Sequence, residues 1–399
     1  MYAGSVRMSL LRCPSCGGSR RTSFYSQERV PVHSCLLLPT REEAERFPRG
    51  TIRLAFCEDC GCIWNTEFDP TLTAYSPAYE DSQAFSPRFR TFADELAAEL
   101  VERYDVHGKR VLEIGCGKGD FLLRLCALGG NSGTGIDPAV DSVEGAESDA
   151  EGVTFIADVY SERYTGIPAD LIVCRHTLEH LPNPGDMLQS IRAGAHGGGS
   201  TIVYLEVPDV SRILSEGAFW DVYYEHCCYF SAGSFARLAR GAGLEVLDVR
   251  YGFDGQYLLL DARLRTDRSS SDPVGPDDVE QVREATARFG ALHAKRVRDW
   301  NARLASLRED GRRAALWGSG SKAVAFLTAL EVGEAIECVV DINPRKQGMY
   351  MAGTRQRIVP PAFLTDDRPD VVIVMNPVYS DEIRSELLSL GLEPELLSL

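Results

Sequence analysis

Short hydrophobic runs recur along the middle of the chain, and most end at glycine, an acidic residue or proline. Runs of this length bounded in this way are typical of strands buried in a sheet. Five of them lie between residues 110 and 208, with the sequences RVLEI, GTGI, TFIA, LIVC and TIVYLEV. A helical segment that ends at Gly241 or Gly243 and two more strand-like runs follow before residue 265. The pattern therefore predicts a seven-stranded α/β sheet.

Two other segments show a helical period. After residues 86–87, a Ser-Pro pair typical of a helix start, Phe92, Leu96 and Leu100 fall on one face. A charged helix is expected over about 279–307, after the polar and turn-rich stretch TDRSSSDPVGPDD. Three aromatic residues before the first of these helices are expected either to close a pocket or to pack in a simple loop: Tyr75, Tyr79 and Phe85.

The last part of the chain repeats the plan of strand, glycine turn and helix in RAALWGSGSKAVAFL. Two further runs, IECVVDINP and PDVVIVMNP, end in polar residues. We expect a second, Rossmann-like α/β domain here. Its glycine turn lacks the full dinucleotide fingerprint, so no second redox cofactor is expected, and a helix N-terminus beside Lys322 suits an anionic diphosphate instead.

The segment DVYYEHCCYF, residues 221–230, follows neither a strand nor a helix period. It groups tyrosines, a glutamate, a histidine and two cysteines, so its composition reflects something besides packing. We interpret the two cysteines as packing residues and Ser231 as the N-cap of the next helix. The alternative is that the tyrosines pack while Glu225 and His226 form a surface pair.

Composition and charge limit the class of protein. A chain of 399 residues is too long for one ordinary core, and we expect three domains. The hydrophobic fraction of 44% is that of a soluble globular protein, and no apolar run approaches the roughly 20 residues of a membrane span. Without a recognisable secretion signal, a cytoplasmic protein that contacts no membrane is expected. A net charge of −16 disfavours nucleic acid polymers but allows a local site for a small anion.

The chain contains 12 cysteines, which we expect to be reduced because several lie in apolar segments. Four of them form two CxxC pairs, Cys13 with Cys16 and Cys57 with Cys60, each followed by glycine. Two residues between thiolates let both sulfurs face one tetrahedral ion, and the glycine permits a tight turn. We predict one structural Zn²⁺ with an inserted hairpin between the pairs; buried or redox-active thiols are the alternative. Weaker ligand candidates are His33, Cys35 and Cys62.

The clearest motif is RVLEIGCGKG at residues 110–119, a strand with an acidic residue and a glycine turn before a helix. Its glycines, Gly115, Gly117 and Gly119, are spaced two apart, unlike the GxGxxG turn of nicotinamide-binding folds. The motif resembles that of the class I S-adenosylmethionine methyltransferases. In that family the glycines let the backbone lie against the methionine part of the cofactor.

The resemblance implies a set of cofactor residues. Asp137, at the end of the second strand, would hold the ribose hydroxyls, and Asp158, at the end of the third, would lie beside the adenine. Because the carboxyl ends of parallel strands meet at one edge of a sheet, these positions converge on one crevice. The implied ligand is S-adenosylmethionine, with S-adenosylhomocysteine as product. The full cofactor set is Tyr79, Glu113, Gly115, Gly117, Asp137, Pro138, Asp158, Val159 and His176.

A closer resemblance covers nearly the whole chain. The stretches YYEHCCYFS, WGSGSKAVAFL and VVDINPRKQGMYMAGT, with the N-terminal CxxC pairs, resemble the three-part C-methyltransferases of deoxysugar biosynthesis. Enzymes of that family remove the proton beside the ketone of a nucleotide-linked 4-keto-6-deoxy sugar and methylate the resulting carbanion. We accordingly expect a zinc-binding domain over 1–75, a methyltransferase domain over 76–265, a linker and helix over 266–310 and a Rossmann-like domain over 311–399.

Carbon methylation explains the residue types of the YYEH segment. A hydrogen beside a ketone is weakly acidic, so a base must remove it while a donor stabilises the enolate oxygen. By resemblance Tyr223 and His226 are the base and its proton partner, Glu225 orients them, and His180 flanks the keto group. Which of the first two takes the proton stays open.

The acceptor site is expected to depart from that of the family. Its members have a His-Gly-Gly-Ser turn after the acceptor motif, whereas this chain has Gly-Phe-Asp-Gly-Gln at 252–256. By resemblance, the C-terminal domain binds the nucleotide end of the substrate. The strand-end residues among the candidates, and Asp341 with them, could equally fix loops. The full substrate set is Tyr224, Asp254, Gln256, Ser319, Lys322, Asn343, Lys346 and Asn376.

Three other functions stay open. One is a methyltransferase that acts on oxygen, nitrogen or carbon of a non-sugar natural product, and at oxygen or nitrogen it would not need the Tyr–His pair. A non-catalytic binder would have lost the cofactor motif, which is intact. A nucleotide-sugar oxidoreductase is favoured by the C-terminal segment alone. We expect a monomer or homodimer whose partner is a small molecule, a nucleotide sugar.

Overall fold

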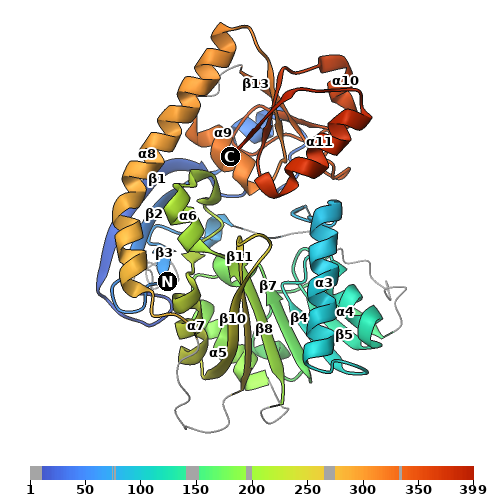
Figure 1. Ribbon diagram of the computed structural model, residues 1–399. Helices are drawn as coiled ribbons and strands as arrows, with labels where there is room; N and C mark the ends of the chain where they lie inside the picture. The colour runs from blue at the N-terminus through green and yellow to red at the C-terminus, as the bar shows by residue number, and fades with distance from the viewer. Residues whose placement is uncertain are drawn as a thin grey trace.

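The computed structural model of the protein describes residues 11–73, 75, 78–140, 152–194, 200–264, 275–331 and 335–399. In this part of the chain the strands form three sheets, of four, seven and five strands. Figure 1 shows the seven-stranded sheet in the lower part of the molecule and the C-terminal strands above it. The predicted linker TDRSSSDPVGPDD lies mostly outside the described residues.

The seven-stranded sheet confirms the α/β fold that the hydrophobic runs predicted. Its order is β10-β11-β8-β7-β4-β5-β6, and β11 runs antiparallel to both of its neighbours. Strand β4 lies between β7 and β5, so the strand order reverses there and a crevice opens at the carboxyl ends. The strands are β4 (Arg110–Ile114), β5 (Ser132–Ile136), β6 (Val153–Ile156), β7 (Leu171–Arg175), β8 (Ile202–Pro208), β10 (Leu244–Gly252) and β11 (Tyr257–Leu264).

Helices cover both faces of this sheet because residues along a buried strand alternate between the faces. Leu171 and Val173 of β7 pack in the cluster that contains α3 and α4, whereas Ile172 and Cys174 pack in the cluster that contains α5 and α7. The helices are α3 (Pro87–Arg103), α4 (Asp120–Gly129), α5 (Pro184–Gly194), α6 (Val210–Glu216) and α7 (Ala232–Gly241).

Helix starts follow the signals in the sequence. The Ser86 hydroxyl accepts the N–H of Phe89 at the start of α3, and Leu96 and Leu100 are buried as the helical period predicted. Ser231 caps α7 in a capping box with Ser234, which confirms its predicted role.

The N-terminal segment forms an antiparallel sheet with an unexpected fourth strand. Strands β1 and β2 are the hairpin predicted between the two CxxC pairs. The fourth strand comes from DVYYEHCCYF, because Cys228 pairs with Trp64 and Tyr229 pairs with Ile63. The elements are β1 (Arg21–Pro31), α2 (Arg41–Glu45), β2 (Arg49–Cys57), β3 (Ile63–Asn65) and β9 (Cys228–Tyr229).

The C-terminal segment forms a parallel sheet in the order β14-β13-β12-β15-β16, as the repeated strand and turn plan predicted. Its elements are β12 (Ala314–Trp317), α9 (Ser321–Ala329), β13 (Ile336–Val340), β14 (Arg357–Val359), α10 (Leu364–Asp367), β15 (Val371–Val374), α11 (Ser380–Ser389) and β16 (Glu395–Ser398). Short 3₁₀ helices are η1 (Pro70–Leu72), η2 (Glu162–Tyr164), η3 (Leu178–His180), η4 (Phe219–Asp221), η5 (Pro361–Phe363) and η6 (Pro377–Tyr379).

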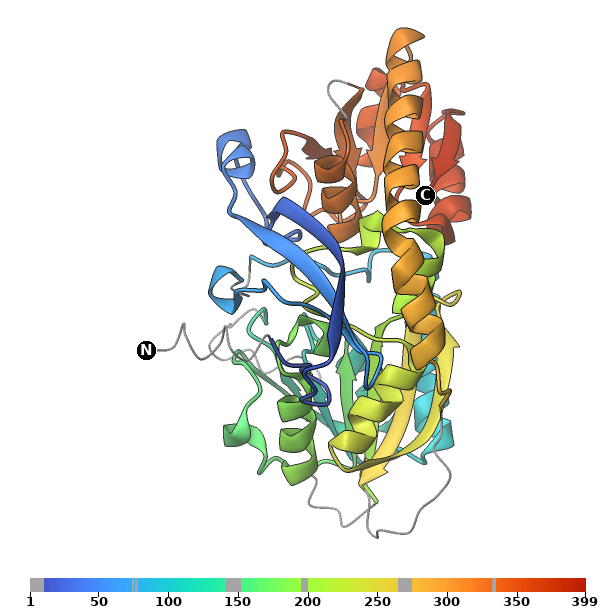
Figure 2. The same cartoon turned by 90° about the vertical axis from the view of Figure 1, so that its left-hand side faces the viewer.

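Helix α8 (Val279–Glu309) connects the parts and matches the predicted charged helix. Its Phe289 packs edge-on against Tyr25 of β1 at 5.3 Å between ring centroids. Further along, Trp300 packs against Phe326 of α9 at 5.1 Å. Figure 2 shows the helix running from the C-terminal segment at the top down beside the N-terminal sheet.

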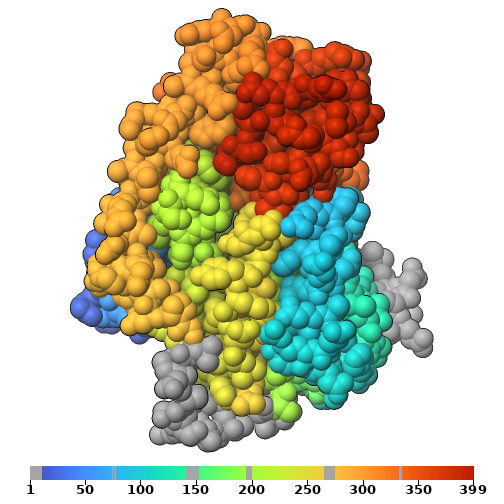
Figure 3. Space-filling view, viewed as in Figure 1, coloured from blue at the N-terminus to red at the C-terminus, as the bar shows by residue number. Residues whose placement is uncertain are grey.

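One hydrophobic cluster contains residues of all three sheets, so the parts share a core. Figure 3 shows the C-terminal segment resting on the segment that contains α3. Hydrogen bonds from Ser86 to Glu382 (2.9 Å) and from Tyr379 to Gln83 (2.8 Å) join the two. Among the described residues, no helix combines the length and the apolarity that crossing a bilayer requires.

Candidate functional site

Two adjoining cavities lie at the carboxyl ends of the central strands. The glycine-turn cavity, of about 260 Å³, is bordered by the turn after β4 and by the end of β5. The intersheet cavity, of about 290 Å³, is bordered by the YYEH segment and by the turns after β12, β13 and β15. Residues that border both are Tyr79, Asp81, Ser82, Gln83, His176 and His180. The two cavities therefore meet at these residues.

The turn after β4 needs glycine for two physical reasons. Gly115 has a φ of +71° and Gly117 a φ of +55°, which other residues adopt rarely. A Cβ at Gly115 would lie 1.9 Å from Thr177 Oγ1, whereas a Cβ at Gly117 would meet open space. The Gly117 N–H donates to Asp137 Oδ2 at 2.9 Å, which ties the turn to the end of β5. The backbone of the turn thus borders the glycine-turn cavity directly.

Glu113 of β4 borders the same cavity and is 2% exposed. Among the described residues, its Oε2 has no hydrogen-bond partner. Burial raises the pKa of Glu113 to about 8, although the nearby Arg175 opposes this shift. A buried carboxyl oxygen without a donor fits a ligand that brings its own N–H or O–H group.

The two acidic strand ends differ in what they contact. Asp137 borders the cavity, and burial raises its pKa. Asp158 accepts hydrogen bonds from the hydroxyl of Tyr164 (2.5 Å) and from Arg163 (3.2 Å), and it does not border the cavity, whereas the exposed Val159 does. Eight of the nine predicted cofactor residues therefore border the glycine-turn cavity, and Asp158 is the exception.

Tyr223 and His226 form a hydrogen-bonded pair on the wall of the intersheet cavity. The Tyr223 hydroxyl and His226 Nε2 are 3.0 Å apart, and the ring centroids are 4.2 Å apart. Burial raises the pKa of Tyr223 well above 10. Burial, together with His180, His176 and Lys322, lowers the pKa of His226 well below 6.5. At neutral pH the pair is a neutral phenol beside a neutral imidazole that can accept a proton.

His180 lies where the two cavities meet. It ends η3, and its ring centroid is 4.8 Å from that of His226. Its Nδ1 is 2.7 Å from the Tyr75 hydroxyl, which fixes the orientation of the ring. Tyr75 and Tyr79, two of the aromatic residues that the sequence suggested for a pocket, border the glycine-turn cavity.

Glu225 makes its hydrogen bonds with the N-terminal segment, which differs from the expectation that it orients Tyr223 and His226. Its carboxylate accepts from His33 Nδ1 and from the Ser34 N–H, both at 2.8 Å, and from the Ser34 hydroxyl. Burial would raise the pKa of Glu225, but these contacts lower it. The sequence offered His33 only as a weak zinc ligand, because its partner lies 192 positions away and leaves no local signal.

Two predicted substrate residues, Tyr224 and Asp254, do not border the intersheet cavity. Tyr224 is 1% exposed and packs on Phe68, and its hydroxyl accepts the N–H of Asp69 at 2.7 Å. Asp254 is exposed and pairs with Arg88 at 3.0 Å. Packing against the N-terminal segment accounts for the position of Tyr224, and a surface ion pair accounts for that of Asp254.

The other six predicted substrate residues border the intersheet cavity: Gln256, Ser319, Lys322, Asn343, Lys346 and Asn376. Gln256 and Asn376 exchange two hydrogen bonds of 2.9 and 3.1 Å across the gap between the sheets. Lys322 forms an ion pair with Asp221, which also pairs with Arg212 at 2.6 Å. Arg212, in α6 after the fifth predicted strand, was not predicted, and it adds a third cation to this cavity.

Glu179 also borders the intersheet cavity and was not predicted. It is 1% exposed, and neither carboxylate oxygen has a hydrogen-bond partner among the described residues. Its Oε1 lies 3.6 Å from His176 Nδ1 and 4.0 Å from His226 Nε2. Glu179, His180 and His226 each have one potential metal-ligating atom, and these three atoms all lie within 4.8 Å of one another. The signal in the sequence that could have indicated Glu179 is its position next to His180, shortly after a predicted strand.

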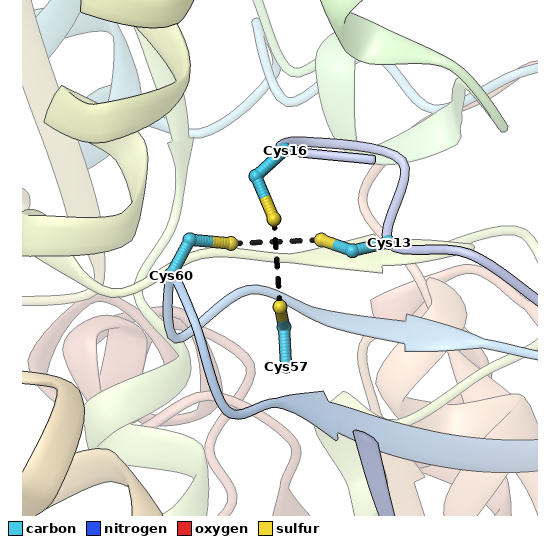
Figure 4. Close-up of side chains that lie close together, drawn as sticks. All are labelled: Cys13, Cys16, Cys57 and Cys60. Carbon is cyan, nitrogen blue, oxygen red and sulfur yellow. Dashed lines mark hydrogen bonds between the residues drawn. The ribbon is translucent and has the colours of Figure 1, made fainter. Parts of the chain in front are cut away.

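The two CxxC pairs form a second candidate site, in which four thiols point toward one centre (Figure 4). The sulfurs of Cys13 and Cys60 are 3.5 Å apart, those of Cys16 and Cys57 are 3.6 Å apart, and all four lie within 4.8 Å of one another. Sulfurs around a tetrahedral Zn²⁺ are about 3.8 Å apart, since each Zn–S bond is about 2.3 Å. The donor set and its size therefore fit zinc.

Both pairs share one turn geometry. The Gly17 N–H donates to the carbonyl of Cys13 at 2.8 Å, and the Gly61 N–H donates to the carbonyl of Cys57 at 2.9 Å. The two glycines have φ values of +74° and +75°. The tight turn predicted after each pair is therefore present, and it requires glycine.

Family models match most of this architecture. Residues 87–249 match the model of a methyltransferase domain, which spans α3 to β10. Residues 279–390 match the model of a C-methyltransferase C-terminal domain, which begins with α8 and includes most of the five-stranded sheet.

Curated relatives agree with these matches. The C-methyltransferase NovU of Streptomyces niveus is 29% identical over 77% of this chain and 75% of its own length. A ubiquinone biosynthesis O-methyltransferase of Bordetella avium is 30% identical over 43% of this chain and 74% of its own length. A crystal structure of an N1-methyltransferase of Burkholderia thailandensis with bound S-adenosylhomocysteine is 20% identical, with a TM-score of 0.35 over 44% of this chain and 79% of that chain.

Proposed function

We propose, since this chain belongs to the S-adenosylmethionine-dependent methyltransferases, that it is a C-methyltransferase that deprotonates carbon beside a ketone and methylates the resulting enolate. The proposed acceptor is a nucleotide-linked keto-deoxysugar. The observation that carries the proposal is the Tyr223–His226 pair, hydrogen-bonded at 3.0 Å on the wall of a cavity that meets the glycine-turn cavity. A methyltransferase that acts on oxygen or nitrogen would need no such pair, because it breaks no C–H bond of the acceptor.

The glycine-turn cavity fits the methyl donor. The unpaired Oε2 of Glu113 would accept from the amino group of its methionine part, and Gly115 and Gly117 let the backbone approach it. Asp137, at the end of β5, would hold the ribose. When bound, S-adenosylmethionine supplies the methyl group that the enolate carbon takes up, and it leaves as S-adenosylhomocysteine.

The acceptor proton is proposed to end on His226. Breaking the C–H bond leaves its electron pair on the acceptor as an enolate, and the proton binds Nε2, either directly or by way of the Tyr223 hydroxyl. His226 is the better base because its imidazole is neutral near pH 7, whereas the phenol of Tyr223 holds its proton. His180, which borders both cavities, is placed to donate to the enolate oxygen.

The nucleotide end of the acceptor is proposed to lie against the C-terminal segment. Arg212, Lys322 and Lys346 place three cationic side chains around the intersheet cavity. Ser319 lies in the turn before α9 and Lys322 in the first turn of that helix, where backbone N–H groups favour an anion. Arg212 and Lys322 share the single carboxylate of Asp221, so the three cations retain positive charge that, with the helix terminus, suits a diphosphate.

Zinc at the four cysteines is proposed to be structural, because all four ligands are protein sulfurs and leave no open position for a substrate. We further propose that residues 1–75, 76–265 and 311–399 are the three domains, with a linker and helix over 266–310. The three sheets support this division, with one exchange: Cys228 and Tyr229 of the second range complete the sheet of the first.

The test is mass spectrometry of the protein incubated with S-adenosylmethionine and a panel of nucleotide-linked keto sugars in deuterated water. We expect a product heavier by one methyl group and solvent deuterium beside the ketone of unreacted acceptor. The Tyr223→Phe variant should bind S-adenosylhomocysteine normally. Its rates of methyl transfer and of deuterium exchange should both fall by roughly 10² to 10⁴ fold, the usual range for a proton-transfer group.

The matched control is Tyr251→Phe, which removes the hydroxyl of a tyrosine that is 57% exposed on β10. It should react as the wild type does. Methylation at oxygen or nitrogen, or methylation of a non-sugar ketone alone, would replace the proposed acceptor. Unchanged exchange and methylation in Tyr223→Phe would remove that residue from the mechanism.

A further inference from the structure

We propose that Glu179 is a positioning residue of the acceptor site whose carboxylate stabilises the imidazolium that His226 becomes on taking the acceptor proton. This inference rests on the proposed function, since it assigns a role in the same proton transfer. Glu179 follows β7 within η3, so its position is set by the central sheet rather than by a loose loop.

The first support is that Glu179 is buried without a hydrogen bond. It is 1% exposed, and both carboxylate oxygens lack a partner among the described residues. Burying a carboxylate costs free energy unless a donor or cation compensates it. A native carboxylate left in this state has capacity for a further donor.

The second support is where the unused oxygen lies. Glu179 Oε1 is 4.0 Å from His226 Nε2, the same nitrogen that lies 3.0 Å from the Tyr223 hydroxyl. Among the described residues, no other carboxylate lies within 4.0 Å of a ring nitrogen of His226. An N–H formed at Nε2 therefore has an acceptor within a small movement.

The third support is the charge around His226. The titratable groups that face its ring are Tyr223 on its own segment, His176 and His180 after β7, Tyr229 of β9 and Lys322 of α9. Among them, His180, His176 and Lys322 disfavour a proton on His226. An anion must offset these groups if His226 is to act as a base, and Glu179 is the carboxylate in place.

His176 explains how Glu179 stays buried between reactions. Its Nδ1 is 3.6 Å from Glu179, and its Nε2 is 2.7 Å from Glu206, which is itself paired with Arg175 at 2.9 Å. Two carboxylates thus alternate with two cations in the order Glu179, His176, Glu206 and Arg175. Glu179, at one end of this row, borders the intersheet cavity. When the acceptor C–H bond breaks and an N–H bond forms at His226, Glu179 gains a hydrogen bond and no proton.

The inference is tested without any acceptor by NMR titration of the protein labelled with ¹³C in its histidine rings. The signal of His226 is assigned from its absence in His226→Asn. Removing an anion lowers the proton affinity of a neighbouring imidazole. In Glu179→Gln the proton affinity of His226, read from its titration midpoint, should therefore be at least tenfold lower than in the wild type. Glu179→Asp keeps the charge and should restore most of the difference. Equal midpoints in the wild type and Glu179→Gln would overturn the proposal.

The control is Glu284→Gln, which removes a carboxylate from an exposed pair with Arg288 on α8 and should leave the His226 midpoint unchanged. If Glu179→Gln does not fold, Glu179→Asp alone tests the proposal. Its shorter side chain holds the carboxylate farther from His226, so the His226 midpoint should lie somewhat below that of the wild type. Tight binding of a second equivalent of Zn²⁺ per chain, lost in Glu179→Gln, would overturn the role in favour of a metal centre.

Deuterium exchange into the keto-sugar panel separates this inference from the proposed function. Exchange that is fast in the wild type and at least tenfold slower in Glu179→Gln, with unchanged KM, supports both. Equal exchange in the two proteins would sink the role of Glu179 alone. A His226 midpoint that depends on Glu179 without exchange on any ketone would support the coupling while removing the proposed acceptor chemistry.

Discussion

His176 combines a left-handed backbone with a buried ion pair at the point where the two cavities meet. Its φ is +48°, a conformation that non-glycine residues adopt rarely. Burial alone would lower the pKa of His176, but the carboxylates of Glu179 and Glu206, 3.6 and 2.7 Å from its ring nitrogens, raise it to about 9. A strained residue held by two carboxylates indicates that the surrounding structure, rather than local preference, sets its position.

The pH dependence of stability should report this ion pair. The folded pKa of about 9 lies above the ordinary 6.5, so the stabilisation is complete below pH 6.5 and is lost as the pH rises through 9. At 1.36 kcal/mol per pKa unit this is roughly 3 kcal/mol. Urea unfolding at pH 6 and pH 10 should show that loss in the wild type.

The matched variant is His176→Asn, because asparagine tolerates a positive φ and carries no titrating charge. It should be less stable than the wild type at pH 6 and should lack the additional loss between pH 6 and pH 10. A variant whose stability falls as steeply as that of the wild type would show that other groups cause the dependence.

Among the elements, the glycine turn after β4 depends on a single residue, Gly115. Gly115 faces Thr177 with room for a hydrogen atom alone, while Gly241 at the end of α7 has no heavy atom near the position of a Cβ. The two glycines were equally visible in the sequence. The neighbours that distinguish them are visible in the fold alone.

We therefore expect Gly115→Ala to abolish binding of S-adenosylhomocysteine, measured by isothermal titration calorimetry. The added Cβ would lie 1.9 Å from Thr177 Oγ1, and alanine is strained at a φ of +71°. Gly241→Ala is the control and should raise the free energy of unfolding by about 0.5 to 1 kcal/mol, since alanine favours a helix more than glycine does. Normal binding by Gly115→Ala would contradict the placement of the ligand at this turn.

The segment DVYYEHCCYF is an element that sequence patterns could not place. DVYYEHCCYF has no regular period, yet Cys228 and Tyr229 complete the N-terminal sheet by pairing with Trp64 and Ile63. Pairing of two residues leaves too short a pattern to predict a strand. The same pairing draws Glu225 to His33 and away from its predicted role beside Tyr223.

At the scale of the whole molecule, this pairing links the proposed zinc site to the proposed acceptor site. Strand β2 ends at Cys57, β3 follows Cys60, and β9 pairs with β3. A disturbance at the cysteines therefore reaches the segment that carries Tyr223 and His226 through one continuous sheet.

Loss of the metal should accordingly impair catalysis as well as stability. Elemental analysis is expected to find about one zinc per chain, and Cys57→Ser should lose the zinc, melt at a lower temperature and transfer methyl groups more slowly. Cys126→Ser, which changes a buried thiol of α4, should keep its zinc. A folded wild type without metal would contradict the zinc site.

Features that depend on local spacing were predictable from the sequence. Hydrophobic runs predicted the seven strands of the central sheet, the paired glycines and Asp137 predicted a crevice at the strand ends, and two CxxC pairs predicted four converging thiols. These features are visible because each arises from residues a few positions apart.

Only the tertiary structure decided which distant residues share an environment. It brought His33 to Glu225, placed Glu179 4.0 Å from His226 and joined the two cavities at His176 and His180. It also moved Tyr224 and Asp254 away from the site. Such contacts form when the sheets pack together, and no periodic pattern in the chain records them, because packing partners are chosen by shape and charge across the whole fold.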